Sequence, residues 1–366
     1  MSTHSVLADS YMRLPIEEDK TGVIHALHNA YRTGRSKPKS SSAEQWREQL
    51  QNSLTTSTWE KDRPVLVRCG HYLNKARASA AAGETEAACL FFLKARLSAE
   101  SKDLSAEGRL RAKTELGANE AYLEYCFGHF ERAKQSLLVS MEAGQQMEQR
   151  FNSPFFHLHR IHLVNNMVKV EAAAQNLHGA MELAANVLLY LQQKAENLPV
   201  PGNWGSCYFR EIPSDAIRFL TAQTTGEIAV ALAGLPPSVV KKALQILLSR
   251  VKIDELCDSW QPEISAWLRL KLLMADDEAQ YAAYFARCIP YFSQGPGYTA
   301  GLWYLTALDV AAVCQPFHDS ESSRLKQDII ADLRRMTHLP RRVRAIVNHL
   351  AANLEQPGSP AQVEIA

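Results

Sequence analysis

Three histidines in one short stretch, His157, His159 and His162, have the residue type and spacing to do metal chemistry. On a helix, residues three apart share a face, so His159 and His162 would project together. Two imidazoles at that spacing can hold a transition metal if a neighbouring helix supplies a third ligand. His157 would point elsewhere, and no Glu-x-x-His partner occurs in the chain. We therefore interpret the three as polar histidines on a helical surface and predict no metal or cofactor, with metal binding kept as an alternative.

Five arginines form the densest basic cluster of the chain, at the predicted end of one helix and start of the next. They are Arg334, Arg335, Arg341, Arg342 and Arg344. Guanidinium groups in such a cluster can bind phosphate or an acidic peptide. The alternative is a solvated face that gains some stabilisation from a helix dipole.

Motifs of known catalytic chemistry are missing. The sequence contains no G-x-S-x-G or G-x-G-x-x-G motif and no Ser-His-Asp order. The 7 cysteines are odd in number, widely spaced and without a C-x-x-C pair. That pattern disfavours a disulfide framework or a cysteine zinc site. We predict a binding protein rather than an enzyme.

The composition favours a helical protein of the cytoplasm. The 366 residues carry a net charge of +1, which is too balanced to attract nucleic acid or an anionic membrane as a whole. The 17 glycines and 16 prolines are fewer than average for this length, which favours long helices. No secretory signal is visible at Met1–Pro15. No apolar run approaches the length that spans a bilayer, roughly 18 residues.

The spacing of apolar residues predicts the helices that carry these side chains. It predicts a helix over 16–33, a flexible, basic, serine-rich linker near 34–43, and a helix over 43–54. From residue 64 the pattern becomes a series of helical hairpins joined by tight turns. Their predicted helices cover 64–82, 87–98, 104–127, 131–150, 155–175 and 179–196.

An internal repeat follows the hairpin corners. Gly83 is followed five, nine and twelve residues later by Ala88, Phe92 and Ala95. Small residues at such positions let two helices approach closely, and the large one fills the space between repeats. The same spacing gives Ala133, Leu137 and Ser140 after Gly128, Ala180, Ala184 and Val187 after Gln175, and Ala279, Ala283 and Ala286 after Met274.

On these residues the chain resembles the tetratricopeptide-repeat-like superfamily over roughly residues 64–315. The resemblance implies an all-α, right-handed superhelical solenoid of antiparallel helix pairs. The corners Gly83 and Gly128 lie 45 positions apart in the sequence. This step is longer than the repeat unit of the family, which is about 34 residues, so no particular family is indicated. A generic antiparallel helical bundle is the alternative.

The repeat is interrupted by a loop insertion at 197–213, which contains three prolines and the aromatic residues Trp204, Tyr208 and Phe209. Long loops of this kind are often functional, so these aromatics either pack on the scaffold or contact a partner. We predict N-terminal helices over 1–60, one repeat domain over 61–354, and a disordered tail over 355–366. Within the repeat domain, further helices are predicted over 215–233, 239–251, 262–274, 277–292, 302–313, 321–336 and 340–354.

The solenoid prediction leads to a protein- or peptide-binding adaptor, because the first helices of stacked pairs line a concave surface. The predicted groove residues are polar and aromatic positions on first helices: Tyr72, Lys75, Asn119, Tyr122, His159, Asn166 and Lys169. Two alternatives stay open. One is a ligand-sensing regulatory subunit of a partner enzyme or transcription factor, and the other is a helical enzyme or metal-binding protein using the His157–His162 region. Neither the partner nor the oligomeric state follows from the sequence.

Overall fold

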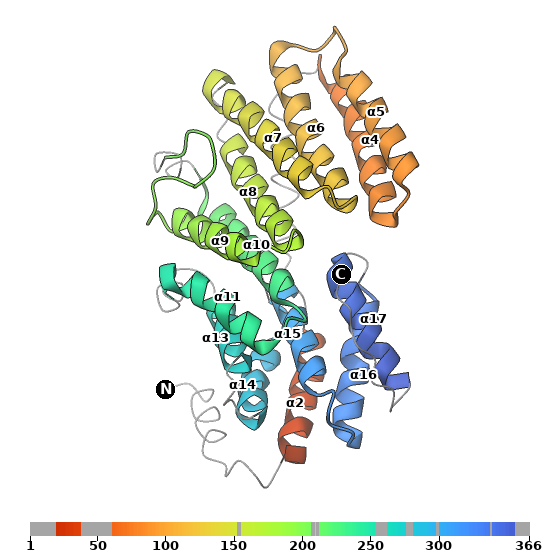
Figure 1. Cartoon of the computed structure of the whole chain (residues 1–366), viewed down its shortest axis with the longest axis vertical. Coiled ribbons are helices and arrows are strands. Elements are labelled where there is room, and N and C mark those ends of the chain that lie inside the picture. The colour runs from red at the N-terminus through yellow and green to blue at the C-terminus, as the bar shows by residue number, and fades with distance from the viewer. Residues whose placement is uncertain are drawn as a thin grey trace. The chain divides into compact units, whose positions relative to one another are not determined.

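The chain is mainly helical in the part that its computed structural model describes. That part comprises residues 20–37, 61–151, 155–205, 209, 212–252, 262–275, 281–297, 300–336 and 339–355. These ranges form fourteen α-helices and no β-strand (Figure 1), which confirms the all-α class. The predicted helix over 43–54 and the predicted disordered tail lie outside the described residues.

The chain separates into two compact units, and one of them is discontinuous in sequence. Residues 43–227 form the central unit, whereas Met1–Ser42 and Ile228–Ala366 together form the split unit. The boundary falls within helix α10 (Ser214–Leu232). This division differs from the predicted one, which separated an N-terminal segment from a single repeat domain over 61–354.

Three helical hairpins make up most of the central unit. In each hairpin the two helices pack together, and α6 also contacts α4 while α7 also contacts α8 (Figure 1). The helices are α4 (Arg63–Ala82), α5 (Thr85–Ala99), α6 (Ala106–Cys126), α7 (Phe130–Phe151), α8 (Phe155–Ala173) and α9 (Leu177–Leu191).

The corners of these hairpins share one backbone conformation. Gly83, Gly128 and Gln175 have φ angles of 81°, 80° and 62°. These values fall in the left-handed region, where a helix can end and reverse. Glycine adopts this region without steric cost, whereas glutamine does so only when the surrounding structure holds it there. Five residues after each corner stands a fully buried alanine: Ala88, Ala133 and Ala180. The predicted spacing therefore does mark close helix contacts.

The split unit combines the N-terminal helix with helices from the end of the chain. Its members beyond the end of α10 are α2 (Lys20–Arg35), α11 (Pro237–Arg250), α13 (Pro262–Met274), α14 (Tyr281–Gln294), α15 (Ala300–Val313), α16 (Ser320–Arg334) and α17 (Arg341–Glu355). Helix α2 packs against α14 and α16.

Helix α2 is held by an aromatic contact and a charged one. The fully buried Tyr31 ring stacks on Trp303 at a centroid distance of 5.0 Å, and its hydroxyl donates to Asp332 Oδ2 at 2.9 Å. Arg35 Nη1 donates to the same carboxylate at 3.1 Å. A side chain on Gly34 would collide with the Phe292 carbonyl, so this glycine permits the close approach of α2 and α14. Gly34 and Arg35 thus belong to a helix rather than to the predicted linker, of which residues 38–43 lie outside the description.

Candidate functional site

A row of polar side chains crosses the central unit from α4 through α6 and α8 to α10, and we call it the polar face. Each helix that contributes several residues places them three or four positions apart, so that they share one side of it. The polar face consists of Arg77 on α4; Arg111, Glu115, Asn119 and Tyr122 on α6; His159, His162, Asn166 and Lys169 on α8; and Gln223 and Glu227 on α10.

Two cations meet at Tyr122 on α6. The Arg77 guanidinium lies 5.4 Å from the centroid of the Tyr122 ring, which is within range of a cation–π interaction. Burial raises the pKa of the Tyr122 hydroxyl, and the positive charges of Lys169 and Arg77 oppose that shift. Tyr122 therefore joins α4 to α8 and keeps its proton at neutral pH.

Glu115 is the acidic centre of the polar face. Burial raises the pKa of its carboxyl group, while the charges of Arg111, Arg77 and His162 act in the opposite direction. These three groups come from α6, α4 and α8 respectively. Glu115 thus links three helices electrostatically, and its charge is balanced within the face.

Side-chain hydrogen bonds connect α8 to α10. Gln223 Nε2 donates to His162 Nδ1 at 2.7 Å, and Thr224 Oγ1 donates to Asn165 Oδ1 at 2.8 Å. Burial raises the pKa of the Glu227 carboxyl group, opposed by the nearby Lys169 ammonium. Hydrogen bonds and a charge interaction therefore tie α10 to the polar side of α8.

Two buried polar atoms on this face have no hydrogen-bond partner among the described residues. Asn119 donates to the Glu115 carbonyl oxygen at 2.8 Å, but its Oδ1 atom has no donor. The Nε2 atom of His159 likewise has no hydrogen-bond partner among these residues. Burial, aided by the Arg111 charge, lowers the pKa of His159 to about 4, so its ring is neutral at pH 7. An unpaired buried polar atom costs about 1–3 kcal/mol, which makes each one a candidate contact for a ligand.

The structure brings together five of the seven predicted groove residues: Asn119, Tyr122, His159, Asn166 and Lys169. Tyr72 and Lys75 face another way. The Lys75 ammonium lies 5.4 Å from the centroid of Phe91 on α5, and the Tyr72 ring centroid lies 6.0 Å from the Lys94 ammonium on the same helix. Arg77, also on α4, contacts the Tyr122 ring on α6.

Sequence reasoning missed several members of the face: Arg77, Arg111, Glu115, His162 as a polar contact, Gln223 and Glu227. Helical spacing could have found two of them, because Glu115 and Arg111 stand four and eight residues before Asn119. The α10 members had no such signal, since their place depends on how α10 packs against α8.

The aromatic residues of the 197–213 loop pack inward where the structure describes them. Trp204 and Phe209 are only 5% and 6% exposed, and both rings make edge contacts with His157 and Tyr190. These two aromatics are therefore anchors of the loop rather than exposed contacts for a partner. Tyr208 lies outside the described residues.

A buried ion pair holds this loop on the scaffold. Arg160 Nη1 donates to both carboxylate oxygens of Glu148, at 3.1 and 2.9 Å, and to the Asn203 carbonyl oxygen at 3.1 Å. The Arg160 guanidinium also lies 4.0 Å from the centroid of Trp204. Both charged residues are almost fully buried, so the pair fixes the loop and offers no reactive group to solvent.

The three histidines that the sequence offers as candidate metal ligands do not lie together in the structure. His157 is fully buried, with Nε2 2.7 Å from the Tyr190 hydroxyl, whereas the rings of His159 and His162 lie 6.1 Å apart on the polar face. Among the described residues, no group of three or more His, Cys, Asp or Glu is placed to hold a metal ion.

The predicted basic cluster stands at the end of α16 and the start of α17. Arg334, Arg335, Arg341 and Arg344 are exposed, and Arg342 is half-buried. Arg335 pairs with Asp332 at 3.3 Å. A solvated arginine face is what the structure describes at this place, and a phosphate or acidic-peptide contact stays a prediction.

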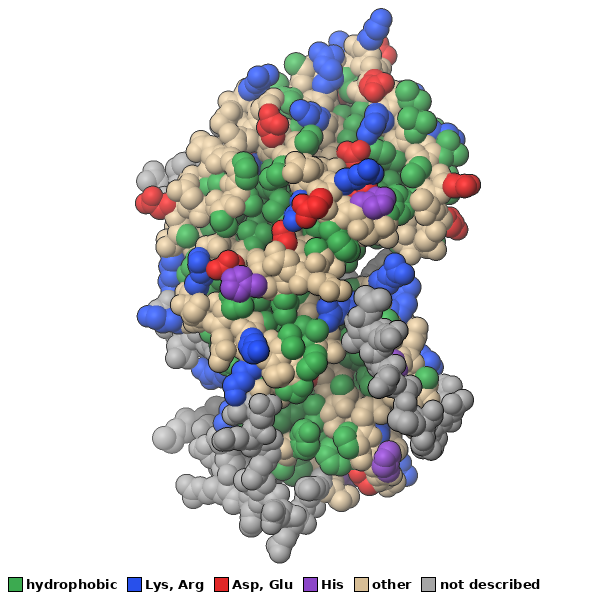
Figure 2. All heavy atoms as spheres, viewed as in Figure 1, with side chains coloured by type: hydrophobic (Ala, Val, Ile, Leu, Met, Phe, Trp, Pro, Cys, Tyr) green, Lys and Arg blue, Asp and Glu red, His purple; other side chains and the backbone are tan. Residues whose placement is uncertain are grey.

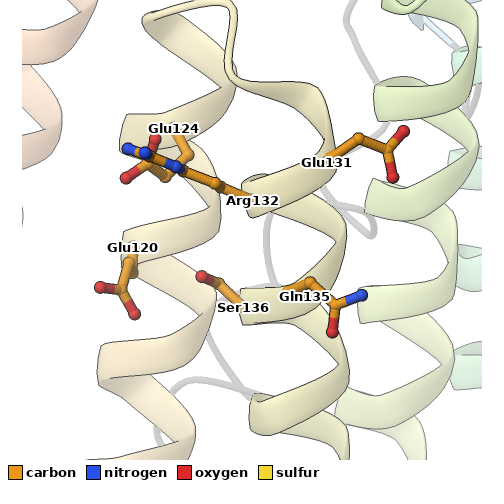
Figure 3. Close-up of a pocket in the computed structure, with 6 residues that line it drawn as sticks. All are labelled: Glu120, Glu124, Glu131, Arg132, Gln135 and Ser136. Atoms are coloured by element: carbon orange, nitrogen blue, oxygen red, sulfur yellow. The ribbon is translucent and has the colours of Figure 1, made fainter.

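A recess of about 350 Å³ between α6 and α7 is lined by charged and polar side chains (Figure 3). Glu120 and Glu124 come from α6, and Arg132, Gln135 and Ser136 from α7. Glu120 pairs with Arg96 at 2.9 Å and Glu124 with His129 at 2.7 Å. The third carboxylate of the lining, Glu131 on α7, pairs with Lys134 at 2.7 Å. Because all three carboxylates already have partners on the protein, we see no acid–base pair here.

Four large aliphatic side chains are exposed on the first hairpin. Leu90, Leu93 and Leu97 on α5 are 51%, 50% and 60% exposed, and Val67 on α4 is 63% exposed. The spacing of the three leucines places them on one side of α5. On the face of the molecule drawn in Figure 2, acidic and basic side chains are interspersed. None of the described helices is long and apolar enough to cross a membrane.

Comparison with known proteins finds no matching family model, no matching curated relative and no matching solved structure.

Proposed function

We propose that this protein is an adaptor that binds a peptide segment of a partner protein on the polar face. The two buried polar atoms without partners among the described residues, Asn119 Oδ1 and His159 Nε2, carry this proposal. The proposed architecture is a right-handed solenoid of stacked helix pairs like those of tetratricopeptide repeats, in which α4, α6, α8 and α10 are the first helices. The left-handed corners and the buried alanines after them support that arrangement.

The chemistry of the face favours an extended peptide. Asn119 Oδ1 accepts hydrogen bonds, and so does the ring nitrogen of a neutral His159 in the matching tautomer, whereas backbone N–H groups donate them. The face holds three basic side chains, Arg77, Arg111 and Lys169, and two carboxylates. This small positive excess gives only a weak preference for an acidic ligand. Hydrogen bonding to the peptide backbone therefore decides affinity more than charge does.

The exposed aliphatic side of α5 gives the adaptor a second surface. Aligned, exposed large aliphatic residues are typical of sites that contact other proteins. Leu90, Leu93 and Leu97 lie on the second helix of the first hairpin, whereas the polar face uses first helices. Two surfaces of different chemistry on one unit are what an adaptor needs to join two partners.

Selection of peptides from a random displayed library on the full chain, followed by calorimetric titration, tests the proposal. We expect bound peptides to lose about tenfold or more in affinity when Asn119 and Asn166 are both changed to alanine. The double variant Asn74→Ala/Asn348→Ala, which removes two exposed asparagines, serves as the matched control. Failure to select any peptide, or equal affinities for both double variants, would contradict the proposal.

A further inference from the structure

A second hollow lies wholly within the split unit and is different in character. It has a volume of about 390 Å³ and opens between the turn after α10, the end of α13, the start of α14, and helices α15 and α17. Its walls are mainly aliphatic and aromatic, including Met274, Tyr284, Leu308 and Ile346. This size falls within the range of small-molecule sites, roughly 300–1,000 Å³.

A glycine brings two of these walls together. Gly234, in the turn after α10, has a φ of 68°, where residues with a side chain are strained. A Cβ atom at this position would stand 2.7 Å from Ile346 Cδ1 on α17. The absence of a side chain at Gly234 therefore lets α17 close one side of the hollow.

Among the described residues that line this hollow, Asp309 on α15 is the one acidic side chain, and the others are aliphatic or aromatic, Tyr281 and Tyr284 included. Lys271 Nζ on α13 lies 2.8 Å from Asp309 Oδ1 and 2.7 Å from Oδ2. Asp309 is 7% exposed and Lys271 is 2% exposed, and the lysine does not line the hollow. Asp309 is thus held by Lys271 on α13 and also borders the hollow.

The carboxylate keeps the capacity to accept a further hydrogen bond. Its two oxygens offer about four lone-pair sites, of which one ammonium group uses a part. Apolar residues of similar volume stabilise a core as well as a buried ion pair does, so packing alone gives no reason for this pair. Binding of a ligand with a hydrogen-bond donor would be a reason for a carboxylate at this place.

We propose that this hollow binds a small, uncharged, largely apolar molecule that carries a hydroxyl group, with the O–H donating to Asp309. The apolar walls accommodate the body of the molecule and exclude water from the hydrogen bond. Lys271 already neutralises Asp309, so a cationic amine gains little from this carboxylate. An anion is disfavoured by the carboxylate itself. The site is independent of the polar face and its peptide.

Calorimetric titration of the full chain with β-naphthol and with its methyl ether tests the donor requirement. Both probes share one aromatic body, but only the naphthol has an O–H. We expect the naphthol to bind about tenfold or more tightly, because a hydrogen bond to a charged acceptor is lost in the ether. Equal affinities for the two probes, or no binding of either, would overturn the proposal.

Two variants test whether the naphthol probe binds in the hollow. Ala312 on α15 lines it and is exposed, so Ala312→Trp fills the space without disturbing a buried contact and should abolish naphthol binding. Ala345→Trp, at an exposed alanine of α17 outside the lining, is the matched control and should bind as the unmodified chain does. Equal losses in both variants would count against this site.

The double variant Asp309→Leu/Lys271→Met tests the role of the carboxylate. It replaces the ion pair by apolar side chains of similar size, a change that preserves folding in other buried pairs. We expect it to bind both probes with equal affinity, which is a loss of the tenfold preference. A preference that survives in the folded double variant would show that another group accepts the hydrogen bond.

Discussion

The central unit and the split unit each bury an ion pair between two helices, and they enclose it differently. In the central unit, Arg160 and Glu148 are covered by a loop that adds a carbonyl oxygen and the Trp204 ring. In the split unit, Lys271 and Asp309 are buried to a similar degree, but the carboxylate borders a hollow of about 390 Å³. The first pair is covered by the loop, whereas the carboxylate of the second lines a hollow.

This difference separates two uses of a buried charge. A charge inside a protein must be compensated by an opposite charge and by hydrogen bonds, or the fold loses stability. Arg160 receives an opposite charge from Glu148, and its Nη1 atom also donates to the Asn203 carbonyl oxygen, which fixes the position of the loop. Asp309 receives part of its compensation from Lys271 and keeps acceptor capacity toward open space. The comparison suggests that position relative to a cavity, rather than burial, distinguishes a binding group from a structural one.

Removing the carboxylate of the enclosed pair should have the largest effect. Glu148→Leu leaves the Arg160 guanidinium buried without its anion, and we expect the free energy of unfolding to fall by about 4 kcal/mol. Urea denaturation followed by circular dichroism measures this loss. Glu142 lies at an exposed position of the same helix, and Glu142→Leu should change stability by no more than about 0.5 kcal/mol. The double variant Glu148→Leu/Arg160→Met should recover most of the loss. A comparable loss in Glu148→Leu and Glu142→Leu would contradict the comparison.

Removing Lys271, the cation of the pair beside the hollow, should lower the free energy of unfolding by a smaller amount. Lys271→Met leaves Asp309 beside the hollow, where it can take up a proton, and we expect a loss of about 2 kcal/mol at neutral pH. Lys242→Met, at an exposed lysine of α11, is the control. Urea denaturation of both variants measures the difference.

The pH dependence of that loss has a definite sign. Burial raises the pKa of Asp309 and Lys271 opposes the shift, so without the lysine the pKa rises further. A carboxyl group with a raised folded-state pKa binds protons more readily in the folded chain, so stability increases as the pH falls. The deficit of Lys271→Met relative to the unmodified chain should therefore shrink between neutral pH and the unfolded-state pKa. A deficit that grows on acidification would contradict this account.

The smallest expected effect concerns His159, a neutral buried group. Its contribution to stability falls as the pH falls, which is opposite in sign to that of Asp309. The pKa of His159 is lowered to about 4 by burial, whereas an unfolded histidine titrates near pH 6.5. The stability that depends on the neutral ring is present above the unfolded pKa and is lost as the pH falls toward the folded one. Between neutral pH and about pH 5.5, His159 should account for a loss of about 1 kcal/mol in the free energy of unfolding.

The variant His159→Gln should lose this component of the pH dependence while His71→Gln, at an exposed histidine of α4, should keep it. Urea denaturation at several pH values measures both slopes. Parallel slopes for His159→Gln and the unmodified chain would show that another group causes the acid sensitivity.

Local sequence signals predicted the helices well where the structure describes them. The predicted helix over 262–274 matches α13, Pro262–Met274, and the one over 64–82 differs from α4 by one residue. Both begin near a proline, which is favoured in the first turn of a helix, and both show the apolar spacing of a half-buried helix. Prediction failed for the partner of α2, because the residues that contact each other are up to 301 positions apart.

The candidate sites were predictable only in part, for a geometric reason. Each residue turns a helix by about 100°, so Lys75 and Arg77 on α4 point in nearly opposite directions. The choice between them depends on how α4 rotates against α6, which the sequence of α4 alone does not encode. The pairing of Asp309 with Lys271 likewise requires α15 and α13 to be neighbours. Neither helix sequence by itself shows that its charged residue has a partner on the other helix.

The position of α2 has a consequence for protein synthesis. A ribosome makes Tyr31 long before its stacking partner Trp303. At about 5–20 residues per second, the interval between them is on the order of tens of seconds. Throughout that time the aromatic side of α2 has no binding surface to occupy, while the intervening central unit can already fold. The side of α2 that becomes buried therefore stays exposed until α14 and α15 have been synthesised.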